Sequence, residues 1–70
     1  MGGSTYKIIE LVGTSEVSWE EAAKSAIEAA GKSLRELRVA EITRHDVTIE
    51  KGKITSFRVR LNVSFKYEKE

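Results

Sequence analysis

The sequence lacks cysteine, contains one histidine and has no excess of charge of either sign. Without cysteine neither a disulfide nor a thiolate metal site can form, and a single histidine cannot build a histidine-rich metal site. Twelve basic residues stand against 11 acidic ones, which argues against a general binder of nucleic acids or membrane surfaces. No apolar run approaches the ~20 residues of a membrane span, and the first residues lack the pattern of a signal peptide. We therefore expect a soluble cytoplasmic protein with no nucleic-acid or membrane partner.

The length of 70 residues leaves room for one domain, which we expect to span residues 1–70 with a flexible N-terminus at 1–5. A lone core of this size stabilises a fold by no more than roughly 3–5 kcal/mol. Small domains usually add disulfides, a metal or partner chains, and only partner chains remain here. The short chain therefore predicts self-association.

Hydrophobic periodicity predicts four elements in the order β-α-β-β. The predicted fold class is α+β, with a three-stranded antiparallel sheet packed on one helix. The expected strands cover residues 6–12, 37–50 and 56–67, the helix runs from 19 to about 34, and turns are expected at 13–15 and 50–53.

Three local patterns refine this prediction. Ser18 and Glu21 fit a capping box at the start of the helix. Ile42 and Val47 cannot share a face of an unbroken strand, so the second strand either has a bulge near residues 43–46 or presents two apolar faces in turn. The third strand alternates strictly, and its odd residues from Phe57 to Phe65 should face the helix. One helix cannot cover three long strands, and two sheet edges stay open, which again predicts a closed homo-oligomer.

Four segments in order carry a resemblance to a known family. They are residues 9–15 (Ile-Glu-Leu-Val-Gly-Thr-Ser) before an Ala-rich helix, residues 32–37 (Lys-Ser-Leu-Arg-Glu-Leu), Glu41-Ile42, and residues 57–65 (Phe-Arg-Val-Arg-Leu-Asn-Val-Ser-Phe). From Tyr6 to about Glu68 the sequence resembles the dodecins, small flavin-binding proteins that assemble as hollow dodecamers. The resemblance implies a cage of twelve identical subunits that holds its ligand at subunit contacts.

The resemblance also implies the ligand position and shows where this sequence departs from it. Family members commonly carry a Trp in a Trp-Phe-Glu-Val-like run, and symmetry-related copies of this Trp sandwich paired flavin rings. Val39 stands at that position and cannot stack, and stacking is worth on the order of 0.5–1.5 kcal/mol per aromatic pair. Arg58 stands where the family has a Gln that reads the flavin edge, and Arg has no acceptor. Val47 replaces a common Gly. We expect binding of riboflavin or FMN to be lost or weakened.

Several other side chains have two interpretations. Trp19 is either a displaced stacking platform or a residue that packs the helix start against the sheet or a neighbouring subunit, and we favour packing. His45 is either a ligand or an exposed strand residue, and we favour the latter. Glu10 is expected to pair with a base. Ser15 and Ser18 are interpreted as capping residues and not as nucleophiles.

The basic row on the third strand is open to both structural and functional interpretations. Arg58 and Arg60 share a face with Lys66 and could bind phosphate, but we favour a ladder with acids such as Glu41 or Glu50. No acid–base pair, nucleophile or metal set stands out, so an enzyme is not expected. The favoured function is a non-catalytic homo-oligomeric cage with flavin binding lost or weakened. The alternatives are a structural or interaction cage without flavin, a binder of a phosphate-bearing cofactor, and a nucleic-acid binder.

Overall fold

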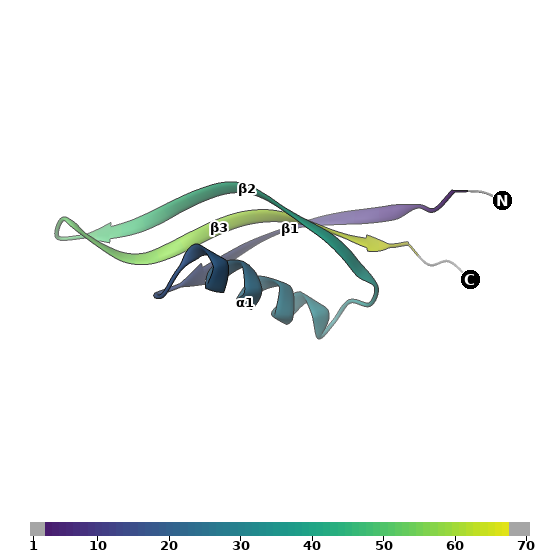
Figure 1. Cartoon of the computed structure of the whole chain (residues 1–70), viewed down its shortest axis with the longest axis horizontal. Helices are drawn as coiled ribbons and strands as arrows, with labels where there is room; N and C mark the ends of the chain where they lie inside the picture. Colours follow the sequence, from purple (N-terminus) through teal and green to yellow (C-terminus); the bar gives the residue numbers. More distant parts are fainter. Residues whose placement is uncertain (1–2, 68–70) are drawn as a thin grey trace.

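The computed structural model describes residues 3–67 and has the predicted order of elements (Figure 1). Residues 1 and 2 of the expected flexible N-terminus and Glu68 at the end of the resemblance lie outside this range. The elements are β1 (Tyr6–Ser15), α1 (Trp19–Gly31), β2 (Leu37–Glu50) and β3 (Lys53–Lys66).

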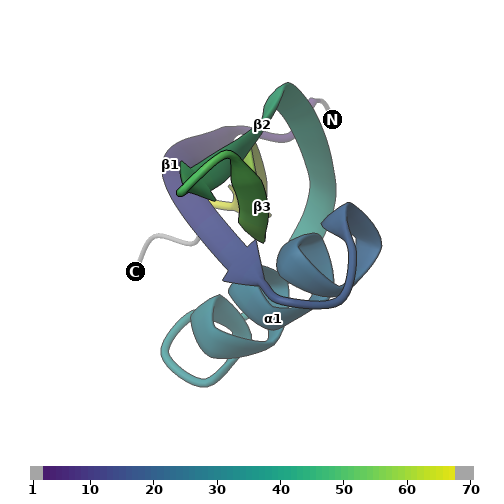
Figure 2. The same cartoon turned by 90° about the vertical axis from the view of Figure 1, so that its left-hand side faces the viewer.

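The three strands form one antiparallel sheet in the order β1-β3-β2, which confirms the predicted fold class. β3 lies in the centre, so β1 and β2 are both edge strands. The molecule measures 56 × 21 × 14 Å, because the tip of the β2–β3 hairpin extends well past the N-terminal end of α1 (Figure 1). The helix covers one side of the sheet only (Figure 2).

The core between helix and sheet is small and consists of side chains from α1 and β3. Among the described residues, the buried hydrophobic ones are Ala22, Ala26, Val59, Leu61 and Val63. Three of them are alternate residues of β3, which confirms that its odd residues face the helix. Ile9, Leu11 and Ile27 pack around this core and are themselves only partly buried.

The prediction of a turn at residues 13–15 is wrong, because β1 continues through them to Ser15. Gly13, Thr14 and Ser15 pair in register with Val59, Arg58 and Phe57. Gly13 lies directly beneath the helix, and a Cβ atom placed there would overlap the carbonyl oxygen of Ala22. The glycine therefore serves a close approach of helix and strand instead of a chain reversal.

The helix begins as predicted and ends earlier than predicted. The backbone N–H of Glu21 donates to the Ser18 hydroxyl at 3.0 Å, which caps the N-terminus. The helix ends at Gly31 and not near Leu34. The last turn tightens there, because the N–H groups of Lys32 and Ser33 donate to carbonyls three residues back. Glycine has low helix propensity and favours this ending.

A bulge causes the change of parity in β2, which confirms the first of the two alternatives predicted for this strand. The register shifts between Ile42 and Arg44, so that Thr43 is the extra residue. Its hydroxyl donates to the carbonyl oxygen of Arg60 at 3.1 Å. At the tip of the hairpin, Lys51 and Gly52 both have positive φ, 52° and 77°, which matches the predicted turn.

Candidate functional site: the outer face of the sheet

The face of the sheet that points away from the helix carries both residues expected at the ligand position. Successive side chains of a strand point to opposite faces, and paired residues share a face. Since Leu61 and its alternate neighbours face the helix, Arg58 and Arg60 lie on the opposite side, which we call the outer face. By register this face also carries Ile8, Glu10 and Val12 of β1 and Val39, Glu41, Arg44 and Asp46 of β2.

Arg58 is held by Asp46, its partner across the β2–β3 register. The Nε atom of Arg58 donates to Asp46 Oδ1 at 2.8 Å, and a terminal nitrogen donates to Oδ2 at 3.1 Å. This is the two-pronged geometry in which a guanidinium matches a carboxylate. The hydrogen bond from Arg58 holds the pKa of Asp46 below its ordinary value of 3.8, and the charges of Arg58, Arg60 and Arg44 add to the effect. Asp46 is therefore an anion at neutral pH.

Trp19 lies on the helix side of the same region and contacts β2 and β3. Its indole N–H donates to the carbonyl oxygen of Asp46 at 3.0 Å. Its ring packs edge-on against Phe57 and His45, with centroids 5.1 and 5.6 Å apart. The structure therefore supports the packing interpretation of Trp19. His45 is exposed, as expected, and points to the side opposite Asp46.

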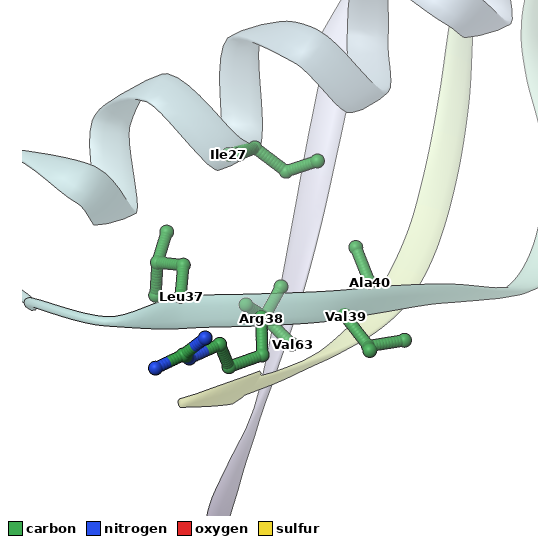
Figure 3. Close-up of a pocket in the computed structure, with 6 residues that line it drawn as sticks. All are labelled: Ile27, Leu37, Arg38, Val39, Ala40 and Val63. Carbon is green, nitrogen blue, oxygen red and sulfur yellow. The ribbon is translucent and has the colours of Figure 1, made fainter. Parts of the chain in front are cut away.

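Val39 lies near the beginning of β2, at the edge of a shallow groove between the helix and the sheet. The groove has a volume of about 160 Å³ and is lined by Ile27, Leu37, Arg38, Val39, Ala40 and Val63. In Figure 3, Ala40 points toward the helix while Val39 points away from it. The Val39 side chain is 63% exposed and offers only aliphatic contact to a ligand on the outer face.

The structure does not bring Val39 and Arg58 together within one chain. Val39 pairs with Ser64, which is six residues from Arg58 along β3. At 3.3–3.4 Å per residue this separation is about 20 Å. A flavin ring system cannot contact both side chains of the same subunit. A site that uses both positions needs residues of more than one chain.

The predicted charge ladder exists, but its acids are Asp46 and Glu10 rather than Glu41 or Glu50. Arg60 Nε lies 3.9 Å from Glu10 Oε2, across the β1–β3 pair. Glu10 thus has the basic partner expected for it.

Glu41 and Glu50 lie elsewhere along the β2–β3 register, and Lys66 belongs to a different groove. Glu41 lies opposite Asn62, and Glu50 lies opposite Lys53. Lys66 lies opposite Tyr6 in the β1–β3 register and lines a groove with Lys7, Arg35, Phe65 and Tyr67.

Acidic and histidine side chains do not gather into a metal site within the described part of the chain. Residues 3–67 contain no group of three or more His, Asp or Glu side chains placed to hold one ion. Across the same residues, no helix is long and apolar enough to cross a membrane.

The fold and the outer face together define a small α+β protein whose sheet is covered by a helix on one side only. A model of the dodecin family matches residues 5–68. The chain belongs to the dodecin family, as the resemblance implied.

Several dodecins are similar to this chain in sequence and in structure. The chain is 45% identical over 64 residues to calcium dodecin of Mycobacterium tuberculosis, covering 90% of this chain and 89% of the relative. Dodecin of Thermus thermophilus is 39% identical over 66 residues, covering 94% and 96% of the two chains. The structure of dodecin from Streptomyces coelicolor superimposes with a TM-score of 0.93 at 33% identity, with both chains fully covered. The structure of the Mycobacterium tuberculosis protein is described as having a novel calcium-binding site and superimposes with a TM-score of 0.82 at 42% identity, covering 93% of each chain.

Sequence reasoning identified Arg58 but missed Asp46 as its partner. The available signal was the parity change in β2, which shows that the strand is irregular near Asp46. The bulge at Thr43 alone does not reveal the pairing, because a second register shift lies between Thr48 and Ile49.

Proposed function

We propose that the protein is a non-catalytic dodecin-like subunit that assembles into a homo-oligomeric cage and has lost the aromatic flavin sandwich. The observation that carries the proposal is the pair of altered positions, an aliphatic Val39 and an Arg58 already paired with Asp46. Neither position offers what the resemblance requires, a stacking plane and a free amide. In a symmetric cage each ligand site would be affected alike.

Self-assembly is supported by the part of the sheet that the helix leaves uncovered. Ile8, Val12 and Val39 on the outer face are 66%, 52% and 63% exposed. Residues 3–67 include only five buried hydrophobic residues, and both edge strands are long. Burying this face against further copies would supply the apolar contacts that one chain lacks. Light scattering and native mass spectrometry should give twelve chains of 7.8 kDa, about 94 kDa. A stable monomer at micromolar concentration would refute the assembly.

The absence of catalysis is supported by the engagement of the two serines near the helix start. Ser15 Oγ accepts from the N–H of Val17 at 2.9 Å, and Ser18 Oγ accepts from the N–H of Glu21. Both hydroxyls serve backbone groups, and neither has a histidine base as its hydrogen-bond partner.

Flavin titration tests the proposed loss of binding. Riboflavin and FMN are added to the wild type and to the double variant Val39→Trp, Arg58→Gln, and the quenching of flavin fluorescence is followed. We expect a response only from the double variant. Submicromolar binding of riboflavin by the wild type would show that the two altered positions do not prevent binding.

Calcium is a second candidate ligand, because the relative that is 45% identical is named calcium dodecin. Within residues 3–67 of one chain no cluster of carboxylates is placed for an ion, so a site would combine acids of neighbouring subunits. Isothermal titration of the assembled protein with Ca²⁺, with Mg²⁺ as the control, tests this. Equal or absent heats for the two ions would exclude a selective calcium site.

A further inference from the structure

Three arginines surround Asp46 on the outer face of the sheet. Arg58 lies opposite Asp46 in the register, and Arg44 lies opposite Arg60 in the adjacent pair on the same face. Side chains at directly opposite positions have Cβ atoms about 4.5–5.5 Å apart, and like charges there repel. The Arg44–Arg60 pairing therefore makes this part of the outer face a place where a negative charge is favourable. We call Arg44, Arg58 and Arg60 the arginine cluster.

The carboxylate of Asp46 fills the anion position of the arginine cluster. Both of its oxygens receive hydrogen bonds from Arg58, at 2.8 and 3.1 Å. The lowered pKa of Asp46 has its main cause in this hydrogen bond, and the positive charges of all three arginines contribute. Glu10 balances the cluster only weakly, since its Oε2 is 3.9 Å from Arg60 Nε.

A guanidinium group binds carboxylate and phosphate oxygens with the same planar fork of N–H donors. While Asp46 is bound to the N–H donors of Arg58, an external phosphate must displace it. Asp46 belongs to the same chain and loses no translational entropy when it binds Arg58, whereas the phosphate does. We propose that Asp46 is a specificity-determining residue that keeps phosphate-bearing ligands off the arginine cluster. The inference rests on the proposed function, because it concerns the same Arg58 position.

The test neutralises Asp46 in the assembled protein and measures binding of inorganic pyrophosphate by isothermal titration. Asp46→Asn keeps the shape of the side chain and removes the charge. We expect it to bind pyrophosphate at least tenfold more tightly than the wild type, with an affinity that falls as salt rises. Trp19 is the only Trp of the chain, and its indole donates to the Asp46 backbone, so its fluorescence offers a second, local readout.

Two further variants show whether a gain arises at this site. Glu36→Gln breaks the exposed Arg38–Glu36 pair, whose N–O distance is 2.7 Å, and should leave pyrophosphate binding unchanged. Adding Arg58→Gln to Asp46→Asn should abolish the gain. The inference is overturned if Asp46→Asn binds no better than the wild type, if the gain survives loss of Arg58, or if Glu36→Gln gains equally.

The result of the Asp46 test can be distinguished from the result of the flavin titration. Riboflavin carries no phosphate, so tight riboflavin binding by the wild type would refute the loss of flavin and leave the pyrophosphate comparison decisive for Asp46. Circular dichroism and native mass first establish that each variant folds and assembles. If Asp46→Asn does not, Asp46→Thr replaces it with a neutral residue that favours strands, and the same expectation applies.

Discussion

Replacing Gly13 by alanine should weaken the contact between helix and sheet at its closest point. An added Cβ atom would overlap the carbonyl oxygen of Ala22 and would lie 3.0 Å from the Cβ atom of Ala26. The main obstacle is backbone, which cannot rotate away like a flexible side chain, so the helix must move off the sheet. Ala22 and Ala26 are two of the five buried hydrophobic residues among residues 3–67, so this movement loosens the core.

The size of the effect follows from the packing. Overpacking of a core typically costs 1–3 kcal/mol, and we expect a loss of about 2 kcal/mol for Gly13→Ala. For a domain of 60–100 residues, 1 kcal/mol shifts Tm by about 4–8 °C, so Tm should fall by roughly 8–16 °C. The proposed assembly would also stabilise the chain, so the melting curves must be recorded at equal subunit concentration.

Gly31→Ala is the matched control for this experiment. A Cβ atom at Gly31 would meet only Leu37 Cδ1, at an ordinary 3.8 Å. Alanine has higher helix propensity by about 1 kcal/mol, so the control should be neutral or slightly more stable. If Gly13→Ala melts at the temperature of the wild type, or if both variants lose the same stability, the close approach at Gly13 is not what requires the glycine.

Other substitutions and one titration test further parts of the structure. Leu61→Asp should prevent folding, because Leu61 is fully buried and an unpaired buried charge costs several kcal/mol; a normal circular dichroism spectrum and native mass would contradict this. Trp19→Phe removes the indole donor to the Asp46 carbonyl and should lower the free energy of unfolding by about 0.5–1.5 kcal/mol, measured by denaturant titration; an unchanged midpoint would show that this bond does not contribute. The carboxyl of Asp46 should titrate below its ordinary value of 3.8 by NMR and return toward it in Arg58→Gln. Because folding lowers the pKa of Asp46, the ion pair stabilises the fold at pH values above the pKa of Asp46 in the unfolded chain. This stabilisation is lost as the pH falls through the lower pKa of the folded protein. If Asp46 titrated equally in the wild type and in Arg58→Gln, the role of Arg58 would be refuted.

The elements that could be predicted are those whose signal is local. The period-two pattern of β3 identified the core residue Leu61 correctly, because one face of that strand is buried by the helix. Ser18 and Gly52 mark a helix cap and a turn through their own backbone and side-chain chemistry. The end of β1 was not predictable in this way, because Gly13 is required by a helix that follows it in the sequence and packs on it in space.

The partner of Arg58 depends on features that the sequence does not display. Counting from the Glu50–Lys53 pair without any bulge, five residues along each strand, would place Arg58 opposite His45. The register shift between Thr48 and Ile49 moves the pairing by one residue, so that Arg58 meets Asp46 instead. A shift of one residue also decides which face a side chain occupies. A single register shift thus converts a cation beside a histidine into an ion pair.

Because of this pairing, the effect of having Arg58 where the family has a Gln cannot be predicted from position 58 alone. The resemblance describes position 58 as one that reads a ligand, and an isolated arginine there would attract phosphate. With Asp46 opposite, the same arginine has its fork of donors filled within its own chain. Val39, about 20 Å away along the sheet, can act at a common site only through another subunit. In the proposed assembly, the ligand preference would therefore depend jointly on the Asp46–Arg58 ion pair within each chain and on contacts between subunits that bring Val39 of one copy toward Arg58 of another.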